Sequence, residues 1–126
     1  MNVEDTFLSF VLAVNRHDIE ALRVLMTDDH VFVDSMGHRE VGADTMKSGW
    51  IGYFAMCPDY WIHTDHFVVN EELVLAVGEA RGTIDGVEWR TPAAWKALIR
   101  EGKVAEWRVF ADNKPVYDIL ARRQKG

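Results

Sequence analysis

The architecture of this chain is set largely by residues 73–111, whose sequence is LVLAVGEARGTIDGVEWRTPAAWKALIREGKVAEWRVFA. Apolar or small residues alternate with polar ones across much of it, which is the period-two pattern of β-strands. Asp85-Gly86 is a two-residue hairpin signal, and Glu101-Gly102-Lys103 provides a second short connection. We therefore predict three successive strands, at residues 73–84, 89–100 and 104–111, which pair as an antiparallel meander.

The residues that precede this meander carry mainly helical patterns. Phe7, Phe10, Val11 and Val14 recur at spacings of three and four, as the buried face of a helix does. Asp and Pro residues then mark further helix ends. The remaining predicted elements are a second helix capped by Asp18 and running to Leu25, a short strand at 31–33, a loop at 37–42, a third helix capped by Asp44 that stops at Pro58, a strand at 61–69, and a closing helix at 116–123.

Helices first and long strands afterwards are typical of the α+β class. The 126 residues are enough for one domain with its own core, so we expect a single domain over residues 1–126. Because long strands twist, we predict a cone: a curved antiparallel sheet with the N-terminal helices packed on its concave side.

Charge and cysteine content narrow the choice of partners and compartment. A net charge of −6 disfavours a nucleic-acid or anionic-membrane surface. No apolar stretch approaches the roughly 20 residues that span a bilayer. The single cysteine, Cys57, cannot form an intramolecular disulfide, and we interpret it as a structural thiol in a reducing compartment. Since Asn2 to Thr6 is polar and acidic rather than signal-like, we expect a cytoplasmic protein with no membrane or nucleic-acid partner.

Asp34 ends the short apolar run Val31-Phe32-Val33, in a chain rich in Trp and Phe. A carboxylate buried in such surroundings is costly unless it is used or hydrogen-bonded. Desolvation raises the pKa of a carboxyl group, and this is how proteins make a general acid or base for use near neutral pH. The alternative is a structural Asp that accepts hydrogen bonds from Ser35 or from backbone N–H groups in a turn.

Four of the five tryptophans, Trp50, Trp61, Trp95 and Trp107, stand where the predicted pattern can turn them inward. Strand alternation places Trp107 and Val109 on one face. A pocket with aromatic walls and few polar groups suits an apolar or aromatic small molecule. The alternative is that large side chains simply fill a small core.

His63 and Asp65 share one face of a predicted strand, where with Trp61 they can reach the same pocket. Two such groups suit a metal site or an acid–base pair. No third ligand follows at a recognisable spacing, so we predict no metal and no cofactor, and we interpret His63 as a polar pocket residue.

Residues 15–18, residues 27–34 and Gly42 together resemble the opening of the nuclear-transport-factor-2-like superfamily. Residues 102–113, GKVAEWRVFADN, resemble its final strand. The most similar sub-group is that of SnoaL-like and ketosteroid-isomerase-like small proteins, and the resemblance covers nearly the whole chain. It implies a curved sheet wrapped around helices, a pocket in the mouth of the cone, and a homodimer formed through the outer face of the sheet.

The resemblance also implies roles for particular residues. Asp34 falls where the steroid isomerases place their proton-transferring Asp, whereas Phe10 and Trp95 replace their two oxyanion donors. The catalytic Asp of the superfamily's epoxide hydrolases falls on Val109. Asp34 is therefore the expected catalytic residue, and the expected substrate-binding residues are Phe10, Val14, Trp50, Phe54, Trp61, His63, Trp95, Trp107 and Val109.

Two functions of different class follow. The first is a cofactor-independent isomerase, dehydratase or cyclase, in which Asp34 moves a proton on an apolar carbonyl or hydroxy substrate. The second is a non-catalytic module that holds an apolar or aromatic ligand in the same cavity. A third interpretation, an accessory dimerisation domain with a filled cavity, would leave no void near Asp34.

Overall fold

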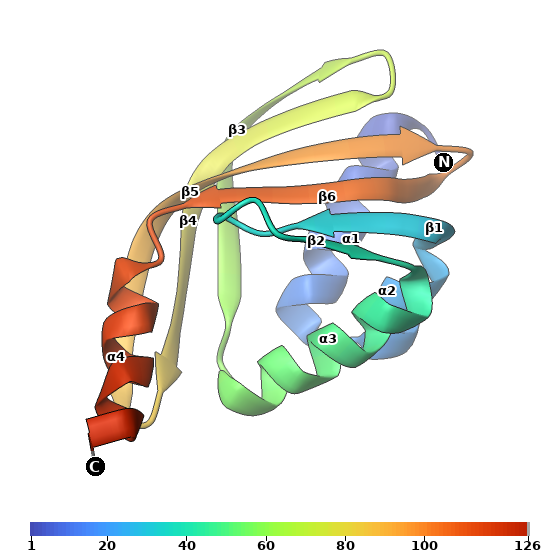
Figure 1. Ribbon diagram of the computed structural model, residues 1–126. Helices are drawn as coiled ribbons and strands as arrows, with labels where there is room; N and C mark the ends of the chain where they lie inside the picture. Colours follow the sequence, from blue (N-terminus) through green and yellow to red (C-terminus); the bar gives the residue numbers. More distant parts are fainter. Residues whose placement is uncertain (126) are drawn as a thin grey trace.

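The computed structural model describes residues 1–125 of the chain (Figure 1). Its helices are α1 (Val3–Arg16), α2 (Ile19–Val24), α3 (Ala43–Met56) and α4 (Lys114–Lys125), and its strands are β1 (Met26–Val33), β2 (Arg39–Val41), β3 (Trp61–Asn70), β4 (Leu73–Ile84), β5 (Val87–Arg100) and β6 (Lys103–Ala111). The predicted α+β class is confirmed. No helix among the described residues is long and apolar enough to cross a membrane.

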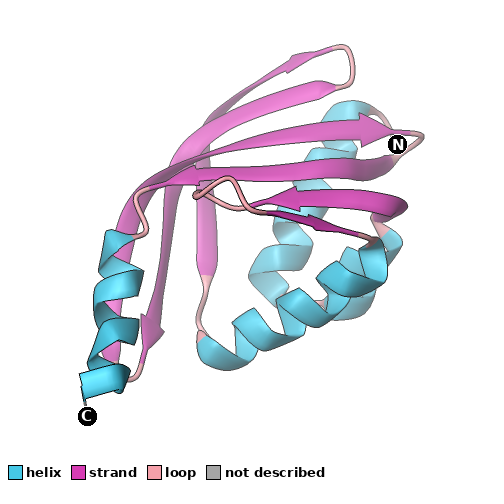
Figure 2. Cartoon of the chain, viewed as in Figure 1, coloured by secondary structure: helices cyan, strands magenta, loops and turns pink. Residues whose placement is uncertain are grey.

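The six strands form one curved sheet in the order β2-β1-β6-β5-β4-β3. Figures 1 and 2 show α1, α2 and α3 under its concave side, with α4 at the bent end of β4 and β5. The predicted cone of a curved sheet around N-terminal helices is thus confirmed. The predicted antiparallel pairing holds for every pair of neighbouring strands except β1 and β6, which pair in parallel, so the sheet is mixed. After two helices, β1 enters the sheet beside its last strand, and no local turn signal encodes that pairing.

The meander of β4, β5 and β6 is held by two tight turns. Ile84 pairs with Val87 across the first, and its central residues Asp85 and Gly86 have φ values of 53° and 77°. Residues 101–102 repeat this pattern of positive φ. Turns of this kind match the right-handed twist of the strands they join. β5 therefore starts at Val87, two residues earlier than predicted, because the turn uses only two residues.

Of the two predicted helix caps, the one at the start of α2 is present and the one at the start of α3 is not. The Asp18 side chain accepts a hydrogen bond from the backbone N–H of Ala21 at 3.1 Å, so it caps α2 as predicted. Helix α3 instead begins after Gly42, which places Asp44 in its first turn. The prediction of an Asp44 cap is wrong, because the unpredicted strand β2 leads almost directly into the helix. The Asp44 carboxylate accepts a hydrogen bond from Arg23 Nε at 2.8 Å and ties α3 to α2.

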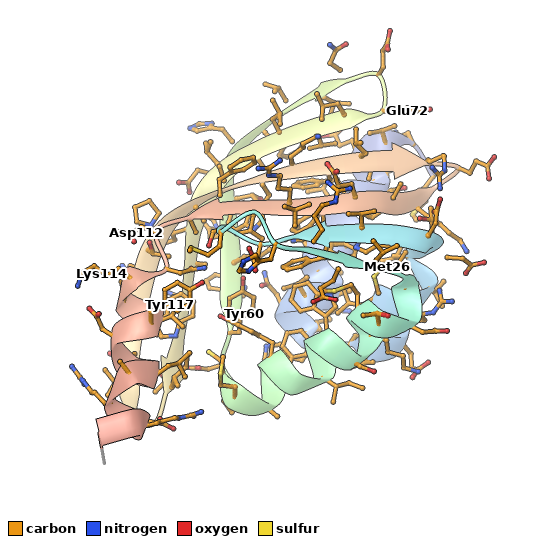
Figure 3. All side chains as sticks on the ribbon, in the orientation of Figure 1. Met26, Tyr60, Glu72, Asp112, Lys114 and Tyr117 are labelled. Carbon is orange, nitrogen blue, oxygen red and sulfur yellow. The ribbon has the colours of Figure 1, made fainter. Side chains whose placement is uncertain are left out.

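The core is an aromatic cluster between α1 and the inner face of the sheet. Phe10 and Trp107 have ring centroids 4.6 Å apart, and Phe7 stacks on Trp107 at 5.9 Å. Trp95 and Trp107 are each only 1% exposed. Figure 3 shows how side chains occupy the space under the sheet. Large aromatic residues bury much area, so this cluster anchors α1 to β5 and β6.

Cys57 follows the last residue of α3 and is fully buried. Burial raises the pKa of its thiol, which keeps it protonated and unreactive near neutral pH. A Cβ at Gly82 would collide with Cys57 Sγ, so the glycine on β4 provides the room that this thiol fills. These contacts are those of a structural thiol.

Gly78 allows β3 to approach β4 at an irregularity. The β3–β4 register shifts between Thr64 and His66, opposite Gly78. A Cβ on Gly78 would collide with the carbonyl oxygen of His63, which is backbone and cannot turn aside. Strand bulges of this kind bend a sheet and increase its twist, so the curvature of β3 depends on a glycine here.

We predict that Gly78→Ala lowers the free energy of unfolding by about 3 kcal/mol or more, because the new methyl group overpacks a backbone contact. The matched change Gly52→Ala lies in the exposed interior of α3, where a Cβ meets nothing within 4 Å. It should stabilise the protein by about 0.5–1 kcal/mol, since glycine is a poor helix former. Urea unfolding of both variants tests this, and equal effects would contradict the proposed packing.

His30 is a fully buried titratable group in β1. Its Nδ1 donates a hydrogen bond to the carbonyl oxygen of Val104 at 2.7 Å. Its Nε2 is buried and has no partner among the described residues. Burial lowers the pKa of His30 below the ordinary value of 6.5, so the folded protein holds it neutral.

Folding stability should therefore fall on acidification. Below pH 6.5 the unfolded chain binds a proton at His30 that the folded protein refuses, so stability is present above that pH and is lost as the pH falls below it. Between pH 7.5 and 5.5 this group should lower the free energy of unfolding, by at most about 1.4 kcal/mol. Urea unfolding at both pH values measures this loss of stability. The loss should be smaller in His30→Leu and unchanged in His63→Gln. An unchanged pH dependence in His30→Leu would contradict the assignment.

Candidate functional site

A cavity of about 530 Å³ lies between α3, α4 and the inner face of the sheet. Its size falls within the range of small-molecule pockets, roughly 300–1,000 Å³. Most of its wall is apolar, formed by Phe32, Met46, Trp50, Ala80, Val109, Ala111, Val116 and Leu120. Small residues on β4 and β6 leave this space, since Ala80 and Ala111 stand where larger side chains would fill it.

Helix α4 closes one side of the cavity. Val116 and Ile119 are 5% and 3% exposed and dock the helix onto the sheet. At the other end of the helix, the Arg123 guanidinium donates two hydrogen bonds to Asp85 in the β4–β5 turn, one of them 2.7 Å long from Nη2. These bonds lower the pKa of the Asp85 carboxyl group. The predicted closing helix is therefore present, and it forms part of the cavity wall.

Asp34 lies at the rim of the cavity, in the turn that joins β1 to β2. Its Oδ1 accepts hydrogen bonds from the backbone N–H groups of Met36 and His38, each at 2.9 Å. Its Oδ2 lies 3.4 Å from His38 Nδ1, and the side chain is 35% exposed. The expectation of a carboxylate buried among Trp and Phe is not met. The turn bonds of the structural alternative are present, yet Oδ2 accepts none of them.

Other polar groups gather near Asp34. Asn113 Nδ2 donates a hydrogen bond to Ser35 Oγ at 2.6 Å, which joins the β6–α4 connection to the β1–β2 turn. Thr45 and a second carboxylate, Glu40, also line the cavity. Sequence reasoning missed Glu40 because it assigned residues 37–42 to a loop. Alternation within β2 would have been needed to place this side chain.

Three tyrosines supply hydroxyl groups to the cavity lining. Tyr53 comes from α3, Tyr60 from the segment before β3, and Tyr117 from α4. Tyr60 and Tyr117 lie in the space between α3 and α4 (Figure 3). Burial raises the pKa of both Tyr53 and Tyr60, so they remain protonated and their hydroxyl groups are able to donate a hydrogen bond. Sequence reasoning missed all three, although Tyr53 follows Trp50 by three residues on one helix face.

The structure separates the sequence-predicted pocket residues into groups. Asp34, Trp50 and Val109 line the cavity. Phe54 stacks on His17 with ring centroids 4.0 Å apart, outside the lining. The others on the inner side are packed into the core at 0–1% exposure, namely Phe10, Val14, Trp95 and Trp107. For these four, core filling describes the position better than ligand contact does.

Trp61 and His63 lie outside the cavity. Ile62 is the inward residue at this end of β3, at 1% exposure, so alternation turns both of its neighbours outward. His63 Nε2 lies 2.9 Å from Asp65 Oδ1, and both side chains are more than half exposed. The expectation that His63 reaches the pocket is therefore wrong. Within residues 1–125, no three His, Cys, Asp or Glu side chains gather as a metal site would need.

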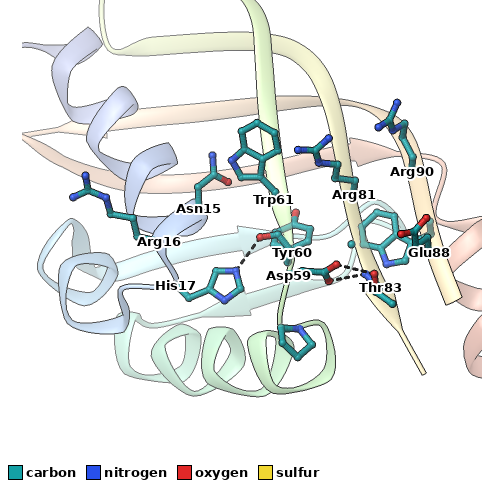
Figure 4. A pocket seen from close by; sticks show the side chains of 13 residues that line it. Asn15, Arg16, His17, Asp59, Tyr60, Trp61, Arg81, Thr83, Glu88 and Arg90 are labelled. Atoms are coloured by element: carbon teal, nitrogen blue, oxygen red, sulfur yellow. Dashed lines mark hydrogen bonds between the residues drawn. The ribbon is translucent and has the colours of Figure 1, made fainter. Parts of the chain in front are cut away.

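A second hollow lies on the other side of a shared wall. This groove of about 900 Å³ runs along the edge of the sheet, where β3 begins and β4 continues past it (Figure 4). Tyr60 and Trp89 line both hollows, and their ring centroids lie 6.1 Å apart. The groove is lined mainly by polar and charged residues, unlike the cavity, and it excludes Asp34. We therefore take the cavity as the candidate active site.

With this geometry in place, comparison with known proteins defines the class. The SnoaL-like domain family matches residues 7–107, and the chain belongs to that family. No curated protein matches the sequence.

Solved structures show the same fold at low sequence identity. IdmH of Streptomyces antibioticus, a candidate polyketide cyclase, has a TM-score of 0.79 at 22% identity, covering 96% of this chain and 99% of that one. A candidate SnoaL-like polyketide cyclase from Shewanella denitrificans has a TM-score of 0.84 at 15% identity, covering 95% and 97%. An LEH-like epoxide hydrolase from Mycobacterium tuberculosis has a TM-score of 0.80 at 15% identity, covering 94% and 86%.

Proposed function

We propose that this chain is a small-molecule enzyme in which Asp34 transfers a proton on an apolar carbonyl or hydroxy substrate bound in the cavity. Isomerisation, dehydration and intramolecular cyclisation all need such a step, and none requires a cofactor for it. One observation carries the proposal: at the rim of an apolar cavity, Asp34 has an oxygen, Oδ2, that accepts no backbone hydrogen bond of the turn.

The turn geometry supports a base of fixed orientation. Two backbone N–H groups hold Oδ1, so the carboxylate plane is set before any substrate arrives. Oδ2 then remains to accept a proton, with His38 beside it. Preorganisation of this kind lets a catalytic group act without reorienting in the transition state.

The tyrosines of the cavity could stabilise the negative charge that proton removal by Asp34 creates. Proton removal next to a carbonyl places negative charge on the substrate oxygen, and a hydroxyl donor stabilises that charge. Tyr53 and Tyr60 suit this role because they stay protonated. They would take over from the oxyanion donors that Phe10 and Trp95 replace. Since each such donor is worth about a hundredfold in rate or more, the tyrosines bear directly on whether catalysis is efficient.

The relatives support this class of function without defining the reaction. Two similar structures are candidate polyketide cyclases, and one is an epoxide hydrolase. In this chain Val109 presents an apolar side chain to the cavity, so no carboxylate stands at that point of the wall for a hydrolase mechanism.

A non-catalytic binding module is the second candidate. The hydrogen bonds of Asp34 in the β1–β2 turn give it a structural role that needs no catalysis. The apolar wall of the cavity is by itself sufficient to hold an apolar or aromatic ligand. The two candidates differ in one observable, which is whether bound ligand exchanges its protons.

Proton removal next to a carbonyl can be measured without knowledge of the natural substrate, as exchange of the α-protons of apolar cyclic ketones in D2O. Mass spectrometry should show faster exchange with the protein than with buffer. Asp34→Asn should reduce that acceleration by about a hundredfold or more, the usual contribution of a general base. Asp65→Asn, which removes an exposed carboxylate outside the cavity, should leave it unchanged.

Three results would overturn the assignment of Asp34. Exchange by Asp34→Asn at the wild-type rate would remove its role as a base. Loss of exchange only in Glu40→Gln would transfer that role to Glu40. Ketone binding with no acceleration of exchange by the wild type would favour the binding module.

We also propose a homodimer through the outer face of the sheet. Val68, Leu75, Val77 and Phe110 are each between 46% and 64% exposed. Strand pairing places them side by side, because Val68 pairs with Leu75 while Ala94 bridges Val77 to Phe110. Contiguous apolar patches of this kind are typical of protein interfaces.

Sedimentation velocity should therefore give twice the chain mass for the wild type. Val77→Lys should shift the protein to monomer, because a charge would be buried in the interface. Ile51→Lys, which changes a 50% exposed residue on α3, is the matched control and should remain dimeric. A monomeric wild type would exclude the dimer.

A further inference from the structure

The groove on the far side of Tyr60 and Trp89 has features of a second binding site. It lies where β3 begins at Trp61, opposite Arg81, while β4 continues past Arg81 to the hairpin without β3 beside it (Figure 4). Its volume of about 900 Å³ exceeds that of the cavity. Because Asp34 is absent from its lining, a ligand here would not touch the proposed base.

The polar atoms on the floor of the groove are largely taken up by hydrogen bonds within the protein. Asn15 exchanges two hydrogen bonds of 2.9 Å with the backbone of Ile62. The Asp59 carboxylate accepts hydrogen bonds from the backbone N–H and the hydroxyl of Thr83, both at 2.7 Å, where β4 no longer pairs with β3. These bonds lower the pKa of Asp59 and keep it ionised. The floor thus gives the groove its shape, but it has few hydrogen-bond donors left for a ligand.

The rim carries two arginines in an unfavourable arrangement. Arg81 and Arg90 are direct cross-strand partners on β4 and β5. Like charges placed opposite each other destabilise a strand pair. Arg90 Nε lies 3.5 Å from a carboxylate oxygen of Glu79, but the Arg90 side chain is 64% exposed, so this long ion pair contributes little energy. No ion pair to Arg81 occurs among the described residues. An anion placed between the two guanidinium groups would relieve their repulsion.

Trp61 orients one of these arginines. The guanidinium carbon of Arg81 lies 4.2 Å from the centroid of the Trp61 ring, and the two residues are partners across β3 and β4. A stacked guanidinium keeps its N–H groups at its edges, where they can bind an oxyanion with two parallel hydrogen bonds. Because Trp61 already restricts the Arg81 side chain, less conformational entropy is lost on binding.

We propose that this groove binds the oxyanion group of a small molecule, a phosphate or a carboxylate, between Arg81 and Arg90. The groove also contains Glu88, whose negative charge disfavours a ligand that reaches its end of β5. The anion is therefore held at the Trp61 end, and the remainder of the ligand extends over the floor made by Asn15 and Asp59. The whole chain carries a charge of −6, so local geometry rather than the overall field attracts the anion.

NMR titration of the 15N-labelled protein with inorganic phosphate and, separately, with acetate tests the proposal. Chloride holds the ionic strength constant. We expect saturable shifts of the Arg81 and Arg90 Nε–H signals and of the Trp61 indole N–H signal. The anion that binds with the lower dissociation constant is the preferred oxyanion. The double variant Arg81→Gln/Arg90→Gln should weaken binding at least tenfold.

The matched control is Arg39→Gln/Arg122→Gln, which removes two exposed arginines elsewhere in the chain. It should bind as the wild type does. Thermal unfolding of each variant confirms that it is folded. Equal shifts on adding chloride alone would mean an adventitious ion only. Equal weakening in the control would mean a response to net charge, and absence of shifts at Arg81 and Arg90 would exclude the site. Because none of these readouts involves exchange at a ketone, the result is independent of the role of Asp34.

Discussion

The packing of Trp107 against Phe10 and Phe7 is the contact on which the rest of this structure depends. It fixes α1 against β6 at centroid distances of 4.6 and 5.9 Å and fills the centre of the curved sheet. Beyond Trp107 the same strand face presents Val109 and Ala111, which are too small to continue that core. The sheet therefore encloses packed aromatic rings in one half and a cavity in the other.

The parallel pairing of β1 with β6 extends this constraint to the proposed base. Phe32 pairs with Trp107 and Val33 with Arg108, so Asp34 emerges beside the cavity-lining end of β6. The hydrogen bond between Asn113 and Ser35 then joins the two chain segments that leave the sheet at this point. The Asp34 carboxylate is placed here because β1, the strand that precedes its turn, is held in the sheet beside β6.

The sequence predicts those features of the fold that depend on residues close together in the chain. The Asp85-Gly86 turn, the lengths of the long strands and the Asp18 cap follow from residues within a few positions of each other. Strand β2 escaped prediction because its three residues are all exposed and show no buried face. The parallel pairing was not predicted because its partners, such as Phe32 and Trp107, lie 75 or more residues apart in the sequence and are joined by no turn.

The site was predictable only in part, for a different reason. The inward phase of β3 is set by Ile62, and a one-residue difference in that phase turned Trp61 and His63 outward. Tyr60 and Tyr117 reach the cavity from segments that no periodic pattern connects to Asp34. Their convergence is a property of the tertiary structure, as is the wall that α4 adds once Arg123 holds it to Asp85.

Where a small apolar ketone binds is the most direct test of the view that the cavity is the functional site. Intermolecular nuclear Overhauser effects between a cyclic ketone and methyl-labelled protein report the position of the ligand. We predict contacts with the methyl groups of Ala80, Val109, Val116 and Leu120, which line the cavity. Contacts confined to Val68 and Val77 on the outer face, or none at all, would contradict that view.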